Sequence, residues 1–350
     1  MIDALAYEPH FLAHLAPVWR ALPARQRGRF LVDPDLMITA RALGIDVVGE
    51  PAPKAIPAYP TPVLDGRLAL VASYGDIKKG RRMGFGPFVF LEHGIAQSYS
   101  GDHRAIEHGS YSGGRDRDDV ILNLVPNDHA AARWRATYPD TETLVVGCPK
   151  LDSLPCRDES PGPVVAISAH FPCNITIETR PALPYYLSVL PELAQRFTVI
   201  GHGHPRYHGI DRVYRRAKIE YVASFDEVCR RADVYVCDNS STLFEFASTG
   251  RPVVVLNSPQ YRRDVDHGLR FETSQGCSTT SGPHFCGAAH VGVQVDRPRD
   301  LAGAIERALA DGPRERANRE RALDIVYAHR TGAAERAAAA IVGLREAVAA

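Results

Sequence analysis

The sequence predicts an α/β fold of two Rossmann-like domains, and three observations support this. Short apolar runs of strand length alternate with helix-length segments along the chain, which is typical of βαβ units around a parallel sheet. A stretch of linker composition, Leu154–Pro163, interrupts this alternation, which then restarts. At 350 residues the chain is also long for a single core, so two domains are expected.

The first half of the chain should contain short strands separated by helices. The expected strands are Arg29–Val32, Asp46–Val48, Leu68–Ala72, Phe88–Leu91, Val120–Leu124 and Thr143–Val146. The expected helices are Phe11–Leu22, Pro34–Leu43 and Asp128–Tyr138. Pro17 lies inside the first of these helices and weakens that prediction. The proline-rich stretch Pro51–Pro62 is expected to be a surface loop.

The second half continues the alternation. Its expected strands are Val164–Ser168, Thr198–Ile200, Asp233–Cys237 and Val253–Leu256, and one helix should end near Phe197. Another helix should begin at Thr242, because Thr242 and Glu245 have the spacing of a capping box, and Gly250 and Pro252 should end it. A final helix is expected around Thr331–Val348.

The polar loop Asp238–Ser241 is the strongest candidate for a phosphate site. It lies where a parallel strand ends and a helix begins, so backbone N–H groups and the positive end of the helix dipole favour an anion there. Ser240 and Ser241 can bind phosphate through hydroxyl and N–H groups, although plain N-capping explains them equally well. Asp238 is expected to shape the loop or contact a ribose. Glu245 is included in the site, with capping as its alternative role.

Two histidines stand at the ends of apolar strands and can carry chemistry. His93 precedes Gly94 at a sharp turn, and an imidazole suits a general base near neutral pH. His204 precedes Pro205, which restricts the backbone and therefore fixes where the imidazole points. Arg206 could bind a phosphate through its guanidinium. Each histidine could instead be a solvated or hydrogen-bonded turn residue.

Four segments in order resemble the CDP-glycerol glycerophosphotransferase family, the makers of teichoic-acid-type polymers. They are FLEHG (Phe90–Gly94), VGCPKLD (Val146–Asp152), GHGHP (Gly201–Pro205) and DNSSTLFEF followed by GRPVV (Asp238–Val254). The resemblance implies a GT-B architecture, in which two Rossmann-like domains face each other across a cleft, and a last helix that packs back toward the N-terminal domain. It implies that His93 is the base and that His204 acts on the donor pyrophosphate or leaving group. Lys150 and Asp152 match the motif that ends the N-terminal domain and would shape the cleft edge.

The expected activity is the transfer of glycerol phosphate, or another alditol phosphate, from a CDP-activated donor to a hydroxyl of a glycan or lipid-linked acceptor, with release of CMP. The expected domains are residues 1–153 and 163–329, joined by 154–162 and followed by the helix 330–350. The sequence departs from the family at Ser168–Pro172, which lacks an arginine and instead resembles the UDP-N-acetylglucosamine 2-epimerases of the same fold. A UDP-sugar epimerase or glycosyltransferase is therefore the alternative, and an inactive nucleotide-binding partner in a polysaccharide assembly complex is another.

The overall composition argues against some classes of binding partner. Lys plus Arg equals Asp plus Glu at 41 each, so no net field favours a nucleic acid. No apolar run has membrane-spanning length, and seven scattered cysteines fit reduced thiols, so a cytoplasmic location is expected. The apolar face of Phe11–Trp19, next to the basic cluster Arg25–Arg29, could contact the inner face of a membrane, although such a face is usually core.

No cofactor is expected, and a metal site is expected to be absent. The one group that suggests zinc consists of Cys277, His284, Cys286 and His290. It lacks the closely spaced cysteine pair of structural zinc sites. This segment is therefore expected to be a loop rich in glycine and serine.

Overall fold

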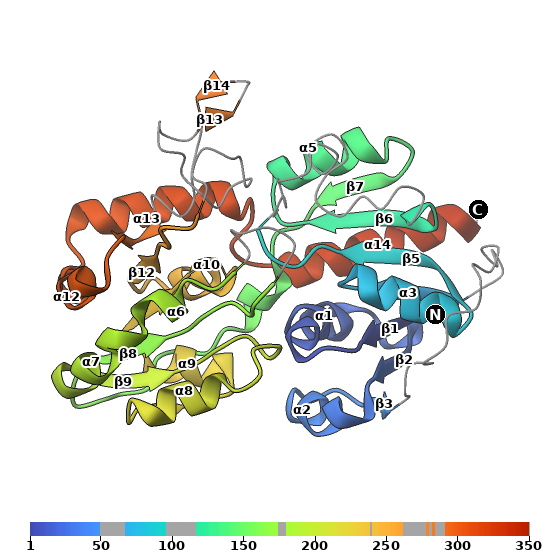
Figure 1. The fold of residues 1–350 in the computed structure, drawn as a ribbon. Helices are drawn as coiled ribbons and strands as arrows, with labels where there is room; N and C mark the ends of the chain where they lie inside the picture. The colour runs from blue at the N-terminus through green and yellow to red at the C-terminus, as the bar shows by residue number, and fades with distance from the viewer. Residues whose placement is uncertain are drawn as a thin grey trace. The chain divides into compact units, whose positions relative to one another are not determined.

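The computed structural model describes residues 1–49, 67–95, 117–173, 180–238, 240–261, 278–279, 282–283 and 291–349. The chain divides into two compact units (Figure 1). Unit 1 contains the described residues up to Ser153 and those from Tyr327 onward, and unit 2 contains those from Leu154 to Val326. The predicted loop Pro51–Pro62 lies outside the described residues.

Unit 1 is built on a parallel sheet with helices on both faces. Its strands, in the order in which they pair, are β3 (Val48–Gly49), β2 (Arg27–Val32), β1 (Ile2–Ala6), β4 (Arg67–Val71), β5 (Phe85–Leu91), β6 (Val120–Val125) and β7 (Glu142–Val145). Its helices are α1 (Pro9–Ala21), α2 (Met37–Ala42), α3 (Tyr74–Arg82), α5 (Asp128–Thr137) and α14 (Ala333–Ala349). The strand order reverses between β1 and β4, and such switch points of parallel sheets are where ligands bind.

Alternating side chains of β1 divide the core of unit 1 into two layers. Ala4 and Ala6 lie in the layer that also contains residues of α1 and α14. Leu5 and Tyr7 lie in the opposite layer, with residues of α3 and α5. This arrangement follows from the two-residue period of a strand and gives a sheet that is buried on both faces.

Strand β1 was missed by the sequence analysis, although it is central in the sheet. Its polar residue Asp3 breaks the apolar run that signals a buried strand. In the fold, Asp3 is only 5% exposed and accepts a hydrogen bond of 2.6 Å from the backbone N–H of Arg29. Its carboxylate also lies 3.6 Å from the guanidinium groups of Arg29 and Arg67, so the buried charge is paired.

Unit 2 contains a second parallel sheet. Its strands, in pairing order, are β10 (Glu220–Tyr221), β9 (Thr198–Gly201), β8 (Val164–Ile167), β11 (Val234–Cys237), β12 (Val253–Leu256) and β15 (Val293–Val295). Its helices are α6 (Leu183–Tyr186), α7 (Leu190–Arg196), α8 (Ile210–Arg216), α9 (Phe225–Arg231), α10 (Thr242–Ala247), α12 (Leu301–Ala310) and α13 (Pro313–Val326). A short antiparallel pair, β13 (Ser278–Thr279) and β14 (Gly282–Pro283), is separate. The strand order of the large sheet reverses between β8 and β11.

The linker segment is attached to unit 2 by a specific contact. The guanidinium of Arg157 donates two hydrogen bonds, of 3.0 and 2.8 Å, to the carboxylate of Asp233. The same carboxylate accepts the backbone N–H of Val164 at 2.7 Å. The segment expected to be a linker is therefore part of unit 2, and Arg157 ties it to the starts of β8 and β11.

The final helix, α14, belongs to unit 1. Ala337 and Ile341 are fully buried in the same core layer as α1. The carboxylate of Asp152 accepts the backbone N–H of Ala334 at 2.7 Å, so it satisfies a donor in the first turn of α14. Asp152 thus caps this helix. Because Asp152 and Ala334 are about 180 residues apart, local sequence spacing could not show this role.

The apolar face of α1 is core, which corrects the suggestion that it touches a membrane. Phe11, Leu15 and Trp19 are at most 6% exposed and pack in the core of unit 1. Membrane contact through that face would require unfolding of the layer. No helix among the described residues has the length and hydrophobicity that crossing a bilayer requires.

Candidate functional site

Polar side chains gather at the carboxyl ends of β8, β9 and β11 in unit 2. These three strands are neighbours, and the loops that follow them carry His170, His204 and Ser240. A backbone hydrogen bond joins two of these loops, because the N–H of His204 donates to the carbonyl of Ala169 at 3.0 Å. The loops therefore meet at the switch point of the sheet, where ligands of open α/β sheets bind.

The imidazole of His204 has a defined orientation. Its Nδ1 accepts the backbone N–H of Arg206 at 3.1 Å, so Nε2 carries the proton in the neutral ring. The ring of Phe171 lies 4.6 Å away, centroid to centroid. His204 can therefore present an N–H donor to an anionic ligand, as expected from the restraint that Pro205 places on the turn.

His170 is a second imidazole of this site that the sequence analysis did not select. Its ring lies 5.4 Å from that of His204 and 4.5 Å from that of Phe171. Its Nδ1 lies 2.9 Å from the carbonyl oxygen of Phe171, so Nδ1 carries the proton and Nε2 is basic in the neutral ring. The guanidinium of Arg206 stands over the Phe171 ring at 5.7 Å. The signal available in the sequence was the position of His170, three residues after the buried strand β8.

Asp238 connects two loops of the site. It is 2% exposed, and its carboxylate accepts the backbone N–H groups of His170 and Ala182, each at 2.9 Å. Both oxygens therefore have partners within the protein, which supports the loop-shaping role and not phosphate binding. Asp238 also contributes, after burial, to raising the pKa of Tyr207.

The loop before α10 differs from the predicted capping box. The helix has Ser241 as its N-cap residue, without a side-chain cap, and Thr242 is its first residue. The Thr242 hydroxyl lies 2.9 Å from both the Ser240 and the Tyr235 hydroxyls, so it is not available to cap the helix. Ser240 Oγ accepts the N–H of Thr242 at 3.4 Å, and Glu245 is 1% exposed.

These contacts limit how α10 could bind phosphate. The helix has only six residues, so its dipole is short. The N–H groups of Leu243 and Phe244 donate to the carbonyls of Ser240 and Ser241 at 3.2 and 3.0 Å. Any contribution of this loop to anion binding therefore comes from the serine hydroxyls and from N–H groups before Thr242.

In unit 1, His93 lies at the carboxyl end of β5, beside the sheet's switch point. Its Nδ1 is 2.6 Å from the carbonyl oxygen of Ala72, so this nitrogen carries the proton and Nε2 is the basic nitrogen of the neutral ring. Gly94 has φ of +94°, a left-handed conformation that favours glycine and turns the chain sharply. His93 therefore has a fixed ring orientation at this turn, and its role as general base stays a prediction.

Two imidazoles of α1 lie beside His93. The centroids of His10 and His14 are 5.9 and 6.0 Å from that of His93. Burial lowers the pKa of His14 well below its usual value, and the positive charges of Lys150 and His93 add to this effect. His14 is therefore neutral at physiological pH. Lys150, matched to the end-of-domain motif, is 6% exposed and points its charge toward this cluster.

Two acids of unit 1 have pKa values near neutrality that the sequence did not indicate. Burial raises the pKa of Glu92 to about 7, against the opposing effects of its hydrogen bond to Trp134 and of the Arg117 charge. Burial likewise raises the pKa of Asp76 to about 7, although Lys79 opposes it. Perturbed acids of this kind are common at functional sites, and both lie next to the His93 end of the sheet.

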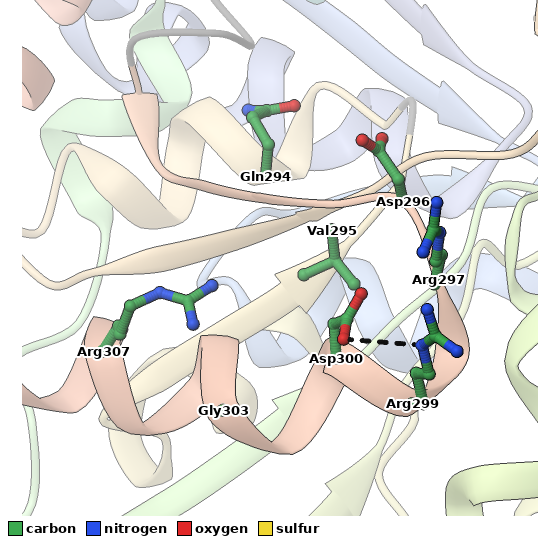
Figure 2. Close-up of a pocket in the computed structure, with 8 residues that line it drawn as sticks. All are labelled: Gln294, Val295, Asp296, Arg297, Arg299, Asp300, Gly303 and Arg307. Atoms are coloured by element: carbon green, nitrogen blue, oxygen red, sulfur yellow. Dashed lines mark ion pairs between the residues drawn. The ribbon is translucent and has the colours of Figure 1, made fainter.

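A separate cavity of about 490 Å³ lies between the end of β15 and the start of α12 (Figure 2). Its lining residues are Gln294, Val295, Asp296, Arg297, Arg299, Asp300, Gly303 and Arg307. Both arginine and aspartate side chains line it, and Arg299 lies 3.9 Å from Asp300. This mixture of charges favours no single ligand class, and none of the sequence-predicted site residues lines the cavity.

No group of His, Cys, Asp and Glu side chains within the described ranges is arranged to hold a metal ion. Cys277, His284, Cys286 and His290 lie outside those ranges. The cysteines of the described residues, at positions 148, 156, 173, 229 and 237, form no disulfide bond.

No protein-family profile matches this sequence, and no curated protein matches it. Solved structures do match it along nearly its whole length. One is a candidate UDP-N-acetylglucosamine 2-epimerase from Listeria monocytogenes, with a TM-score of 0.61 and 13% identity, covering 99% of this chain and 96% of that one. Another is the UDP-GlcNAc 2-epimerase from Neisseria meningitidis bound to UDP-GlcNAc, with a TM-score of 0.56, 12% identity and 98% coverage of both chains.

The wall teichoic acid polymerase TagF, soaked with the ligand CDPG, is also similar. Its TM-score is 0.58 at 11% identity, and the match covers 98% of this chain and 87% of that one. At these identities the similarity shows the fold and nothing finer. The chain thus has two parallel-sheet α/β domains, consistent with the GT-B fold of these proteins, and the predicted fold class is confirmed.

Proposed function

We propose that this chain is an enzyme that acts on a nucleotide-activated sugar or polyol, whose diphosphate unit 2 binds. The observation that carries the proposal is the approach of His170 and His204, whose rings lie 5.4 Å apart on the loops after two neighbouring strands, next to the strand whose loop carries Ser240. Diphosphates need several directed donors, and charge-assisted hydrogen bonds are the strongest available. The nucleotide ligands named for the similar solved structures support the same class of substrate.

The histidines would bind the diphosphate in complementary ways. His204 presents Nε2–H in its neutral form, because Nδ1 accepts the Arg206 N–H. His170 donates through Nδ1–H to Phe171, so it gains a donor at Nε2 only when it is protonated. Arg206, above the Phe171 ring, adds a permanent positive charge. Protonation of His170 would therefore strengthen binding as the diphosphate arrives.

His93 in unit 1 would be the base of the reaction. Its Nδ1 is engaged with the Ala72 carbonyl, so the basic nitrogen is Nε2. General bases of this type contribute about 10²–10⁴ to the rate. The fully buried, neutral His14 beside it adds no competing positive charge. Ser240 and Ser241 would assist in unit 2, where their hydroxyls can contact the ligand.

Of the specific reactions, epimerisation of a UDP-sugar such as UDP-N-acetylglucosamine has the better support. Two of the epimerase structures match over almost the whole chain, and the Ala169–His170 pair follows β8 at the switch point. Such an epimerisation removes a proton from one face of the carbon whose configuration changes and adds a proton to its opposite face. His93 would be the base that removes the proton, and a water or side chain on the other side of the sugar would supply the new one.

Alditol-phosphate transfer from CDP-glycerol to a glycan or lipid-linked acceptor is the second candidate. It is favoured by the four family-type motifs, including the His93–Gly94 turn and the His204–Pro205 turn. In this reaction His93 would deprotonate the acceptor hydroxyl. His204 would neutralise charge as CMP leaves, since phosphoryl transfer depends mainly on positioning and charge stabilisation.

One experiment separates these reactions. The protein is incubated in D₂O with UDP-N-acetylglucosamine, CDP-glycerol or CDP-ribitol, and the products are followed by NMR. An epimerase incorporates solvent deuterium into the UDP-sugar, whereas a transferase releases CMP once an acceptor is added. His93→Ala should remove either activity. If the wild-type protein converts none of these compounds and binds none of the nucleotides, the proposal is wrong.

A further inference from the structure

Glu92 and His93 follow β5 in the sequence, and their side chains are held on opposite faces of the sheet. The carboxylate of Glu92 accepts a hydrogen bond of 2.7 Å from Trp134 Nε1, on α5. His93 instead donates through Nδ1 to the carbonyl of Ala72 and packs 4.8 Å from the ring of Phe11, on α1. The backbone N–H of Glu92 also donates to Leu124 on the neighbouring strand at 2.9 Å. The chain at His93 is thus held from both faces.

The Glu92 anchor is buried beside a charged guanidinium. Glu92 is 5% exposed, and Arg117 is 1% exposed with its guanidinium 4.8 Å from the Trp134 ring and 5.6 Å from the Phe90 ring. The Arg117 charge lies close enough to favour the carboxylate form of Glu92. The Glu92 carboxylate accepts an indole N–H and lies near a guanidinium that is enclosed by aromatic rings. Moving such a buried group away from its partners costs free energy. The side chain of Glu92 therefore has one defined position.

We infer that Glu92 and Trp134 are positioning residues for His93: their hydrogen bond fixes the end of β5 and thereby keeps the His93 imidazole on the Ala72 carbonyl. This inference rests on the proposed role of His93 as base. Glu92 does not act on the ligand itself, because its carboxylate is directed to α5. Loss of the bond should let the turn at Gly94 relax and allow the imidazole to leave Ala72. A misplacement of about 1 Å near a reacting group can cost on the order of 10²-fold in rate.

The test uses two substitutions, one at each end of this hydrogen bond. Trp134→Phe removes the N–H donor and keeps an aromatic ring against Arg117. Glu92→Gln removes the charge and keeps an oxygen that can accept from Trp134. Nitrogen-15 NMR of the His93 imidazole, assigned with His93→Gln, reports which ring nitrogen is protonated. Turnover and nucleotide affinity are measured on the same proteins.

We expect wild type and Glu92→Gln to show His93 mainly as the Nδ1–H tautomer, and Trp134→Phe to show a mixture of tautomers. Turnover of Trp134→Phe should fall at least tenfold, with nucleotide affinity unchanged. Ile77→Val is the control, because Ile77 packs in the same core layer but lies on α3; it should lower stability only. An unchanged His93 tautomer in Trp134→Phe overturns the inference. Because the tautomer is measured without substrate, failure of the proposed reaction would not be mistaken for failure of this inference.

Discussion

At the scale of single residues, Asp238 should be the most sensitive position of the candidate site. Its carboxylate is the acceptor for two buried N–H groups, of His170 and Ala182. Asp238→Ala leaves both without that acceptor, and each such loss costs about 1–3 kcal/mol. Denaturant unfolding should show a loss of at least 2 kcal/mol. Glu192→Ala, at an exposed position of α7, is the control and should change stability by less than about 0.5 kcal/mol.

The charge of Glu92 predicts a dependence of stability on pH. Burial raises its pKa in the folded protein from 4.5 to about 7, so the folded chain binds this proton more tightly than the unfolded chain. The associated stabilisation is fully present below pH 4.5 and is lost as the pH rises to about 7. Its size is on the order of 3 kcal/mol.

Urea unfolding at pH 5 and pH 8 tests this dependence. Wild type should lose more stability between these values than Glu92→Gln, because the amide does not titrate. Glu192→Gln, which removes an exposed acid, should behave as wild type does. Equal losses in wild type and Glu92→Gln would show that the buried carboxyl does not titrate in this range.

At the scale of elements, α1 should contribute to stability through its buried face. Leu15 is fully buried, so Leu15→Ala should destabilise the protein by about 2–5 kcal/mol, from lost burial and from the cavity that remains. Ile38→Ala on α2 removes a side chain that is 84% exposed and should be nearly neutral. Thermal unfolding of both variants measures this contrast. Comparable losses would mean that the face of α1 is not core.

Helix α14 should depend on its cap. Asp152→Ala removes the acceptor for the Ala334 N–H and should cost about 0.5–2 kcal/mol of stability. Asp152→Asn keeps an oxygen acceptor and should recover much of that loss. If both variants match wild type in urea unfolding, the bond does not stabilise the helix.

The strands that could be predicted are those with uninterrupted β-branched and aromatic runs. The run Val253–Leu256 was placed with the correct ends, and the run near Val234 to within one residue. Strand β1 was missed because Asp3 interrupts its pattern, and only the distant residues Arg29 and Arg67 make that burial possible. Pairing between residues far apart in sequence is not visible in local periodicity.

Candidate site residues could be selected from the sequence where a polar residue follows a strand by two or three positions. His93 and His204 stand at such ends, and the structure places each with a fixed imidazole. His170 has the same signal but was not selected. The capping of α10 was mistaken because Tyr235, which engages the Thr242 hydroxyl, lies on the preceding strand. Contacts of that kind depend on the folded arrangement and not on spacing alone.

At the scale of the whole molecule, the proposed function divides the work between the units: unit 2 binds the nucleotide and unit 1 supplies the base. His93→Ala should therefore abolish turnover and leave nucleotide affinity unchanged, whereas His204→Ala should weaken affinity. Turnover assays and calorimetry on the same preparations check this division. Loss of nucleotide affinity in His93→Ala would contradict it.

Binding of a diphosphate by the loops after β8 and β9 can be measured by calorimetric titration with UDP, UMP and uridine, and with CDP, CMP and cytidine. The diphosphates should bind at least about tenfold more tightly than the monophosphates, which corresponds to one or two charge-assisted hydrogen bonds. That advantage should disappear when His170 and His204 are both replaced by alanine. It should persist in His208→Ala, which changes an exposed histidine of the same loop. Equal affinities for UDP, UMP and uridine, or a double variant that keeps the tenfold advantage, would contradict the account.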